Sequence, residues 1–338
     1  MKKITIIAGA LLSLLVGVSS CNDEWTEEQF VHYIGFRAPL DATTGVTPLY
    51  VQYTRTDTTG KATYGEGQSD YKLPLIVSGS TTNDKDFTVH VANDPDTLKD
   101  LNYARYQNRT DLHYVDMQQY ATFPEKVDFT KGSDVSLLNI KFNFNNIDMS
   151  EKWVLPIRIT PGAGYTPNTR KNYDNALLRI FPFNDFSGVY NGTTLLNYVK
   201  GDEGNGAIVA NTVTAYVVND NTVFFYAGIN DEDRTDRRNY KIFMQFEGET
   251  SGTIKMWSDN PKINFVSNKE ASFRVSETMD EVRPYLMHRY VTINNIDYEY
   301  TDYTSSSELS TTFTVRGSIT MERKINTQIP DEQQAIEW

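Results

Sequence analysis

The chain has 338 residues, of which 44 are acidic and 32 are Lys or Arg, and its formal net charge is −12. This balance argues against a nucleic-acid-binding role, because phosphate backbones are bound by clusters of Lys and Arg. The length suggests two domains with a large core. A single cysteine means that no disulfide within the chain supports them.

The first twenty residues are typical of a secretory signal peptide. Lys2 and Lys3 precede an apolar run at residues 4–18, which is shorter than the roughly 20 apolar residues that span a membrane. Small residues then lead to Cys21, the only cysteine. A cysteine at the cut site resembles the lipobox of bacterial lipoproteins, in which the thiol carries a diacylglycerol. The alternative is an ordinary signal peptide in which the cysteine has no role.

We therefore expect residues 1–20 to be a signal peptide, Cys21 to be the lipid attachment site and residues 21–25 to form a lipidated tether. Residues 22–28 are mostly acidic. An acidic run directly after the lipidated cysteine resembles the surface-export signal of Bacteroidetes lipoproteins. The resemblance implies an outer-membrane, lipid-anchored protein that faces the outside of the cell. The acyl chains supply the anchor, so the fold itself need not touch the bilayer.

The rest of the chain has the pattern of an antiparallel β protein. Apolar and polar residues alternate with period two at residues 87–91, 138–144, 240–246 and 312–321. Polar and Gly-rich turns separate these runs. Helical signals are few, and Pro95 opens a short one. Many short strands and few helices predict an all-β fold built from sandwiches or barrels.

A domain boundary is predicted near residues 180–188, where a strand-like run ends in Pro182 and a polar turn. This divides the chain into domains at residues 26–182 and 183–338. The linker is short, so we expect the two domains to pack with limited freedom.

The first domain has two related strand-like runs, at residues 71–77 and 153–159, with Pro74 and Pro156 in their middles. Proline cannot donate to a ladder, so the sequence predicts edge-type strands here. Together with residues 83–89, these runs resemble the Ig-like N-terminal domain of a group of Bacteroides lipoproteins. That domain also precedes some family-18 glycosidases. The resemblance implies an N-terminal Ig-like β-sandwich.

The second domain resembles the β-rich C-terminal domain of the same lipoproteins, on the segments at residues 186–192 and 217–226. Its Gly188-x-Tyr190-x-Gly192 opening is also similar to that of lipocalins, whose barrels hold a ligand in the mouth. We therefore expect a second antiparallel β-domain, either a lipocalin-like barrel or a second sandwich.

Lipoproteins of this type commonly belong to polysaccharide-utilisation loci, where they capture glycan beside an outer-membrane importer, as SusE and SusF do in the starch system. The resemblance implies a non-catalytic glycan-binding protein whose partners are a glycan and an importer complex. The resemblance to these proteins lies in architecture and not in a sugar-binding motif. Two alternatives remain: a surface adhesion or structural module that binds protein, and a cryptic glycosidase.

The sequence carries no motif of a known enzyme class. A Gly-rich phosphate loop, an HExxH pair, a nucleophile-elbow serine and the DxxDxDxE motif of family-18 glycosidases are all missing from the 338 residues. We expect no enzyme activity, no cofactor and no metal. The acidic residues at 231–233 and Asp236 offer Ca²⁺ ligands, but Arg234, Arg237 and Arg238 interleave with them. The mixed charges predict a solvated loop with local ion pairs.

Four aromatic residues of the second domain are the candidate glycan-binding residues. Sugar rings stack on aromatic side chains through their apolar C–H faces. Trp257 precedes a polar turn at residues 258–261, and Tyr303 lies in a Ser/Thr-rich stretch. Tyr298 and Tyr300 share one face of a strand, so the alternative is that they line the core with their hydroxyls at its rim.

Overall fold

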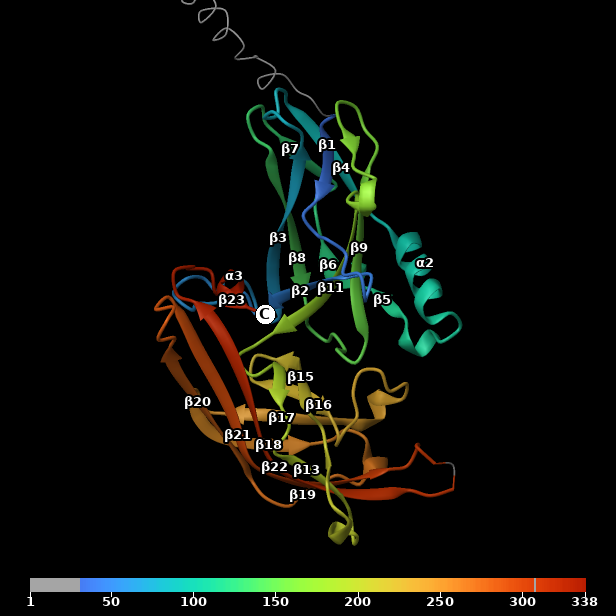
Figure 1. Cartoon of the computed structure of the whole chain (residues 1–338), viewed down its shortest axis with the longest axis vertical. Helices are drawn as coiled ribbons and strands as arrows, with labels where there is room; N and C mark the ends of the chain where they lie inside the picture. Colours follow the sequence, from blue (N-terminus) through green and yellow to red (C-terminus); the bar gives the residue numbers. More distant parts are fainter. Residues whose placement is uncertain (1–30, 307) are drawn as a thin grey trace, which may run out of the picture.

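The computed structural model describes residues 31–306 and 308–338. The expected signal peptide, Cys21, the tether and the acidic run up to residue 28 lie outside the described residues. The described chain forms two β-domains that lie end to end, a sandwich followed by a barrel (Figure 1). This confirms the predicted all-β fold class.

The N-terminal domain is a sandwich of two sheets. The first sheet has the strand order β10 (Thr166–Pro167), β1 (Tyr33–Phe36), β3 (Gln68–Ser78), β8 (Val135–Asn143) and β6 (Ala121–Thr122). The second has the order β2 (Thr47–Gln52), β11 (Asn175–Phe183), β9 (Lys152–Thr160), β4 (Phe87–Asn93) and β7 (Lys126–Phe129), and β5 (Tyr114–Asp116) also pairs with β9. Alternate residues of both sheets point inward, so Leu73, Leu75, Leu155 and Ile157 fill one buried core between them.

The prediction that Pro74 and Pro156 mark edge strands was wrong. Pro74 lies in β3 and Pro156 in β9, and each strand has a neighbour on both sides. The carbonyl of Pro74 accepts from the amide of Arg37, and that of Pro156 accepts from the amide of Asp94. Both donors lie just beyond the end of the neighbouring strand. The N–H and C=O of a strand residue point to the same neighbour, so an N–H at either position would also face a residue beyond the end of that neighbouring strand. Each proline therefore removes no hydrogen bond from the regular part of a ladder.

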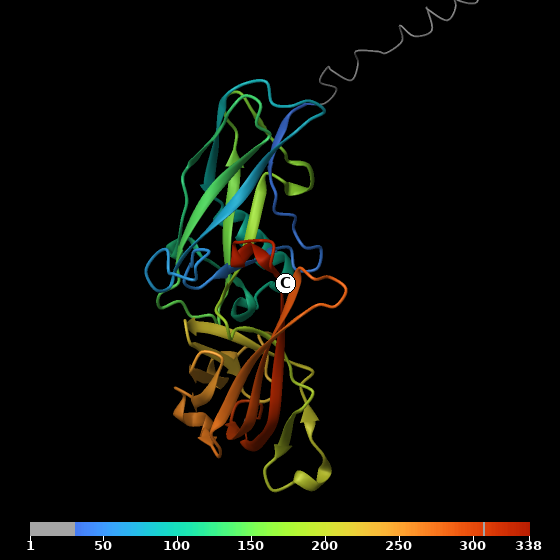
Figure 2. The same ribbon diagram turned by 90° about the vertical axis from the view of Figure 1, so that its left-hand side faces the viewer.

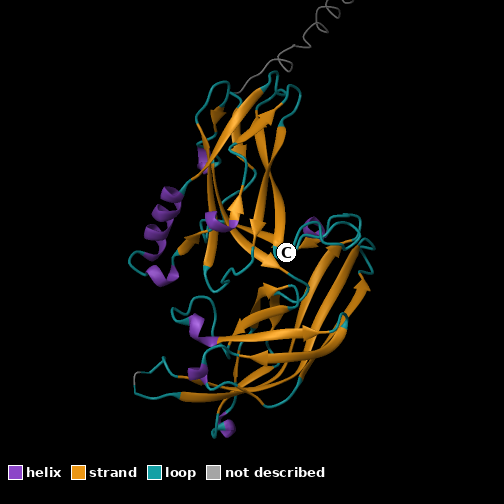
Figure 3. Cartoon of the chain, turned by 180° about the vertical axis from the view of Figure 1, so that it is seen from behind, coloured by secondary structure: helices purple, strands orange, loops and turns teal. Residues whose placement is uncertain are grey.

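The helices are few and lie at the periphery (Figure 3). The longest, α2 (Pro95–Tyr106), begins where Pro95 signals it, and the Asp94 side chain caps it by accepting from the amide of Thr97. Short 3₁₀ turns are η2 (Thr110–Leu112), η3 (Gln118–Tyr120), η4 (Arg170–Asn172), η5 (Glu203–Asn205), η6 (Arg237–Tyr240) and η7 (Pro261–Ile263). A final short helix, α3 (Glu332–Ala335), follows the last long strand.

The C-terminal domain is a closed antiparallel barrel, which decides between the two alternatives left open by the sequence. Around the barrel the order is β12 (Gly188–Asn191), β15 (Thr212–Asn219), β16 (Thr222–Tyr226), β17 (Lys241–Glu247), β18 (Ser251–Trp257), β20 (Ala271–Met279), β21 (Leu286–Asp302) and β22 (Thr311–Asn326). The pairing of Asn191 in β12 with Thr320 in β22 closes the ring. Large side chains, among them Phe225, Phe246 and Tyr298, fill its interior.

Four short strands complete this sheet. β13 (Leu195–Val199) and β14 (Ile208–Val209) extend outward from β22 and project from the body of the barrel (Figure 2). β19 (Val266–Ser267) pairs with β21. β23 (Ile336–Glu337) pairs with β22 and follows α3, which contacts β2 of the sandwich. The C-terminal segment therefore connects the two domains a second time, in addition to the linker at residues 184–187.

Candidate binding groove at the domain junction

An aromatic row crosses the outer face of the barrel beneath the sandwich. Tyr216, Phe224, Phe243 and Trp257 come from four successive strands and occupy directly paired positions. Neighbouring ring centroids lie 5.2, 6.0 and 5.3 Å apart. We call this row the aromatic ladder. Its members pack into the same buried cluster as the sandwich core, so the ladder is the apolar part of the domain interface.

A loop of the barrel at residues 227–240 supplies the polar part of the interface. Glu232 forms an ion pair with Arg179 of β11 at 2.5 Å, and Asp233 forms one with Lys152 of β9 at 2.9 Å. The hydrogen bond from Lys152 lowers the pKa of Asp233. The sequence predicted local ion pairs here. Arg234 does pair with its neighbour Asp236, whereas Glu232 and Asp233 hold the barrel against the sandwich.

Arg237 is the most buried charged residue of this loop. Its side chain is buried, and its Nε donates to the carbonyl of Ser150 at 2.8 Å while Nη1 donates to the carbonyl of Asp111. Bonds from a charged donor to backbone carbonyls are among the stronger hydrogen bonds in proteins. The interface therefore combines apolar packing with charged groups that already have partners, as expected for domains that do not move freely.

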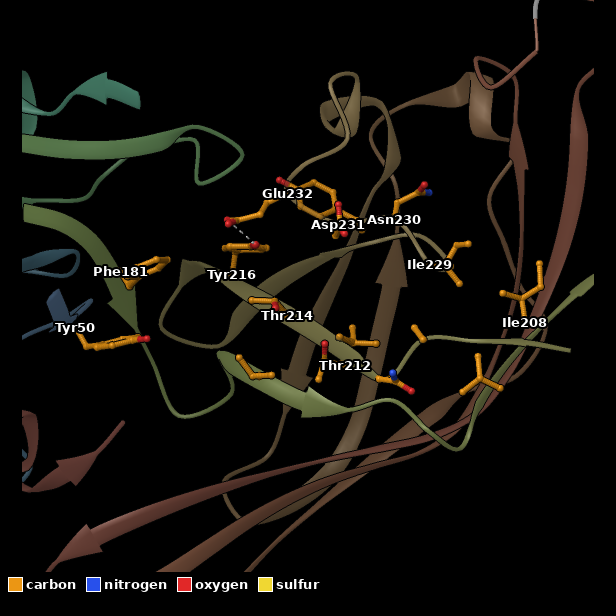
Figure 4. Close-up of a pocket in the computed structure, with 17 residues that line it drawn as sticks. Tyr50, Phe181, Ile208, Thr212, Thr214, Tyr216, Ile229, Asn230, Asp231 and Glu232 are labelled. Carbon is orange, nitrogen blue, oxygen red and sulfur yellow. Dashed lines mark hydrogen bonds between the residues drawn. The ribbon is translucent and has the colours of Figure 1, made fainter. Parts of the chain in front are cut away.

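Beside this interface an open groove of about 520 Å³ lies between the two domains (Figure 4). Tyr50 and Phe181 form its sandwich wall, and Tyr216 and Thr214 face them from the barrel. The volume falls within the range of ligand-binding clefts. The other lining residues are Val189, Ile208, Val209, Ala210, Asn211, Thr212, Val213, Tyr226, Gly228, Ile229, Asn230, Asp231 and Glu232.

The sandwich wall is a stack of aromatic rings. The Tyr50 ring lies 4.0 Å from that of Trp338 at an interplanar angle of 5°, and 5.3 Å from that of Phe181. The guanidinium of Arg179 lies 4.6 Å from the centre of the Phe181 ring. Tyr50 and Phe181 are half-buried, so parts of both rings remain open to the groove. The stack holds these rings in place before any ligand arrives.

The barrel wall is more polar. The hydroxyl of Tyr216 donates to Glu232 at 3.3 Å, and burial, followed by the charge of Glu232, raises the pKa of Tyr216 well above its ordinary value. The phenol therefore remains neutral and serves as a donor. Thr212 and Thr214 on β15 add hydroxyl groups. Asn230 adds an amide whose nitrogen donates to the carbonyl of Ala227 and whose oxygen accepts from Arg234. Such groups can fix the orientation of a ligand whose apolar face rests on the aromatic wall.

The structure separates the four aromatic residues that the sequence proposed for glycan binding. Tyr298 and Tyr300 are buried inside the barrel, where the Tyr298 hydroxyl accepts from the amide of Gly228. They fit the alternative interpretation as core residues, and a glycan cannot reach their rings in the closed barrel. Trp257 is half-buried at the end of the aromatic ladder. Tyr303 is half-buried, and its hydroxyl accepts from Asn260.

None of these four residues lines the groove. The groove residues that sequence reasoning missed are Tyr50, Phe181, Tyr216 and the C-terminal Trp338 that supports Tyr50. Each lies in a strand or near an end, and nothing in the local pattern separates it from a core aromatic residue. The one usable signal was Phe181 beside Pro182 at the predicted domain boundary, because ligand sites occur often at domain junctions.

Two further properties hold for the part of the chain that the structure describes. No helix within residues 31–306 and 308–338 is long and apolar enough to cross a membrane. Across the same residues, His, Asp and Glu side chains do not gather in groups of three or more that could hold a metal ion.

Comparison with known proteins places the chain in a family. Residues 25–163 match a domain family of unknown function, DUF4973, and residues 174–320 match a family of C-terminal domains. No curated protein matches the chain.

Several solved structures match over nearly the whole length. An auxiliary nutrient binding protein from Bacteroides thetaiotaomicron is 48% identical, with a TM-score of 0.82, and the match covers 88% of this chain and 96% of that one. A multidomain protein including DUF1735 from Bacteroides ovatus is 39% identical, with a TM-score of 0.78 and coverage of 90% and 100%. A protein of unknown function from Bacteroides ovatus is 33% identical, with a TM-score of 0.75 and coverage of 88% and 94%. The chain therefore belongs to the Bacteroides protein family that includes this auxiliary nutrient binding protein.

Proposed function

We propose that the protein is a non-catalytic, glycan-binding lipoprotein of the cell surface, which captures glycan for an outer-membrane importer in the manner of SusE and SusF. The observation that carries the proposal is the groove at the domain junction, which presents half-buried aromatic rings opposite hydroxyl and amide groups. Membership in a family with an auxiliary nutrient binding protein supports a nutrient-binding role.

The groove has the two components that carbohydrate recognition needs. Tyr50 and Phe181 offer apolar surface to the C–H face of a sugar ring, and the aromatic stack limits the entropy that they lose on binding. Thr212 and Thr214 offer hydrogen bonds to hydroxyl groups from the opposite wall. A chain of sugar units can lie along an open groove of this kind, whereas a closed pocket would admit only a chain end.

The position of the groove suits an anchored protein. The described chain begins at Val31, at the tip of the sandwich that points away from the barrel (Figures 1 and 2). A lipid on Cys21 would attach at this end. The sandwich would then act as a spacer that holds the groove away from the membrane, which supports a role in capture at the cell surface.

The carboxylates of the groove support binding more than catalysis. A glycosidase uses two carboxyl groups that flank the scissile bond, one of which donates a proton. Of the two carboxylates in the described lining, Glu232 is engaged by Arg179 and by the hydroxyl of Tyr216, which leaves Asp231 without a second free carboxylate beside it. This arrangement suits a carboxylate that holds the two domains in position. We therefore propose that a bound glycan leaves the protein intact.

Isothermal titration calorimetry of the protein lacking residues 1–20 against a glycan panel tests the proposal. Thr212→Trp fills the groove from an exposed position and should abolish binding. Phe181→Ala removes a stacking surface and should weaken binding by about 1–3 kcal/mol. Tyr103→Ala, which removes an exposed aromatic residue on α2 far from the groove, should bind like the wild type. Binding that survives Thr212→Trp would place the site elsewhere, and release of reducing ends would point to an enzyme.

A protein-binding adhesion module is the second candidate function. Four exposed aliphatic residues, which we call the apolar lip, line the groove: Val189, Ile208, Val209 and Ile229. Apolar patches of this kind are also found where proteins dock. A folded protein that binds no member of a broad glycan panel would favour this candidate.

A further inference from the structure

The lining of the groove restricts which glycans it can accept. We propose that it selects uncharged glycans with apolar substituents, such as deoxy-methyl or O-acetyl groups, and disfavours glycans that carry carboxylate or sulfate groups. This inference rests on the proposed glycan-binding function and names the ligand class of the same groove.

The charged side chains that line the groove are acidic. Asp231 and Glu232 line the groove, and none of its described lining residues is Lys, Arg or His. Arg179 offsets the charge of Glu232 through their ion pair. Asp231 is exposed, and its carboxylate accepts only a backbone hydrogen bond, from the amide of Asp233, among the contacts found for it. One uncompensated negative charge therefore faces the groove.

This charge acts directly against an anionic ligand. Two like charges about 4 Å apart in water repel by an amount equivalent to about a fivefold loss of affinity. The repulsion is screened over about 8 Å at physiological salt, so it acts only on groups bound in the groove itself. A uronic acid or a sulfated sugar would meet this repulsion and would find no cationic side chain in the lining to bind it.

The apolar lip of the groove consists of exposed aliphatic side chains. Val189, Ile208, Val209 and Ile229 belong to three different segments, and each is between 41% and 59% exposed. Ile208 and Val209 form β14, the short strand that extends from the barrel. Ile229 follows Gly228 in the barrel loop at residues 227–240. All four line the same groove, in contrast to the singly scattered apolar residues of an ordinary protein surface.

A fully hydroxylated sugar is a poor match for this lip. Each hydroxyl that turns toward an aliphatic side chain loses a hydrogen bond to water without a replacement. A methyl group at the same position is instead removed from water, which raises affinity about fourfold for each group that is fully buried. Deoxy sugars and acetylated sugars carry such methyl groups without adding charge. The two properties of the groove thus point to the same class of ligand.

The first experiment measures binding to a printed array in which each neutral glycan has a modified counterpart. The probes are O-acetylated glucomannan and its alkali-deacetylated form, fucosylated and unfucosylated galactosides, and galactan beside polygalacturonate and a sulfated galactan. We expect the strongest signals from acetylated or deoxy members and the weakest from the carboxylated and sulfated ones. Preferential binding of anionic members would overturn this inference while leaving the proposed glycan-binding function in place.

The second experiment measures matched variants on the galactan and on its sulfated form, which differ in charge. Asp231→Asn should raise affinity for the anionic form about fivefold at low salt and leave the neutral form unchanged. Asp100→Asn, which removes an exposed charge on α2, should change neither. Equal behaviour of the two variants would show that Asp231 exerts no selection and would refute the charge part of the proposal.

Ile229→Ser and Val209→Ser test the apolar lip. Each should reduce the preference for the acetylated or deoxy form over its unmodified counterpart about two- to fourfold. Val282→Ser, on an exposed turn outside the groove, is the control and should leave the preference intact. A preference that survives both lip variants would contradict the proposal that the lip selects apolar substituents. The absence of binding to any member of the array would instead reject the proposed function, and this inference would fall with it.

Discussion

Arg179 of the sandwich and Glu232 of the barrel form an ion pair across the domain junction, with 2.5 Å between Nη2 and Oε2. The same guanidinium lies against the ring of Phe181, which forms part of the groove wall. One largely buried cation thus connects the interface to the candidate site. Because both domains contribute to this contact, the shape of the groove depends on how the domains are held together.

Glu232→Gln should therefore destabilise the protein by about 2 kcal/mol. The substitution leaves Arg179 largely buried without its counter-ion, and an uncompensated buried charge costs more than the pair contributes. Urea unfolding followed by tryptophan fluorescence measures the change. Glu281→Gln removes an exposed charge from a turn of the barrel and should have little effect. Equal stabilities of the two variants would mean that the ion pair does not hold the domains.

Trp257→Ala should lower stability by about 1–3 kcal/mol, because the ring stacks on Phe243 and packs into the interface cluster. The groove does not include Trp257, so glycan binding by the folded variant should be close to that of the wild type. Differential scanning calorimetry and titration of the same sample separate the two effects. Lost binding with an unchanged melting temperature would restore Trp257 as the glycan platform.

Gly317→Ala should be strongly destabilising, by roughly 3 kcal/mol or more. Gly317 lies in β22 with φ +145°, and an added Cβ would approach the carbonyl oxygen of Thr194 to 1.9 Å. The backbone at Thr194 and at the start of β13 must therefore move if a side chain is added. Gly204→Ala is the matched control, since no atom lies within 4 Å of its added Cβ. A small effect at Gly317 would indicate that β13 can separate from β22 without cost.

The barrel should lose stability as the pH rises above neutrality because of His288. This side chain lies between Glu322 and Asp280, at 2.5 and 3.0 Å, and hydrogen bonds to these carboxylates raise its pKa above the ordinary value of 6.5. A raised pKa in the folded state gives stabilisation that is complete below the unfolded pKa and disappears as the pH rises through the folded one. Melting temperatures between pH 6 and 9 should therefore fall more steeply for the wild type than for His288→Gln. Parallel curves would exclude this contribution.

The proposed anchor leads to a prediction in cells. Cys21→Ala removes the thiol that the lipobox would acylate, so the variant should leave the membrane fraction and carry no lipid by mass spectrometry. Protease added to intact cells should digest the wild-type protein if it faces outward. Protection in intact cells together with digestion after lysis would place the protein on the inner side and contradict its display at the surface.

Much of the fold follows from local patterns in the sequence. Period-two alternation at residues 312–321 indicates a strand with one buried face, and the structure buries Val315, Ile319 and Met321 there. The same reasoning found the start of α2 at Pro95. It misplaced the strands of Pro74 and Pro156, because the length of the neighbouring strand decides whether a missing donor matters.

The candidate site could not be found in this way. Tyr50, Phe181, Thr214 and Asp231 are far apart in the sequence and meet only where the two domains pack. Tyr298 and Tyr300 illustrate the opposite case, since their spacing fits a sugar-binding face and a core face equally well. Barrel closure, which depends on the pairing of β12 with β22, decided between them by turning both rings inward.

The sequence by itself determined the β character of the chain, its acidic composition and the presence of a signal-like N-terminus, because these depend on composition and on contacts between near neighbours. The tertiary structure alone decided that the second domain closes into a barrel, which aromatic rings remain accessible and which charges are paired. Those properties depend on pairings between distant strands and between domains, and the same local pattern is compatible with several of them.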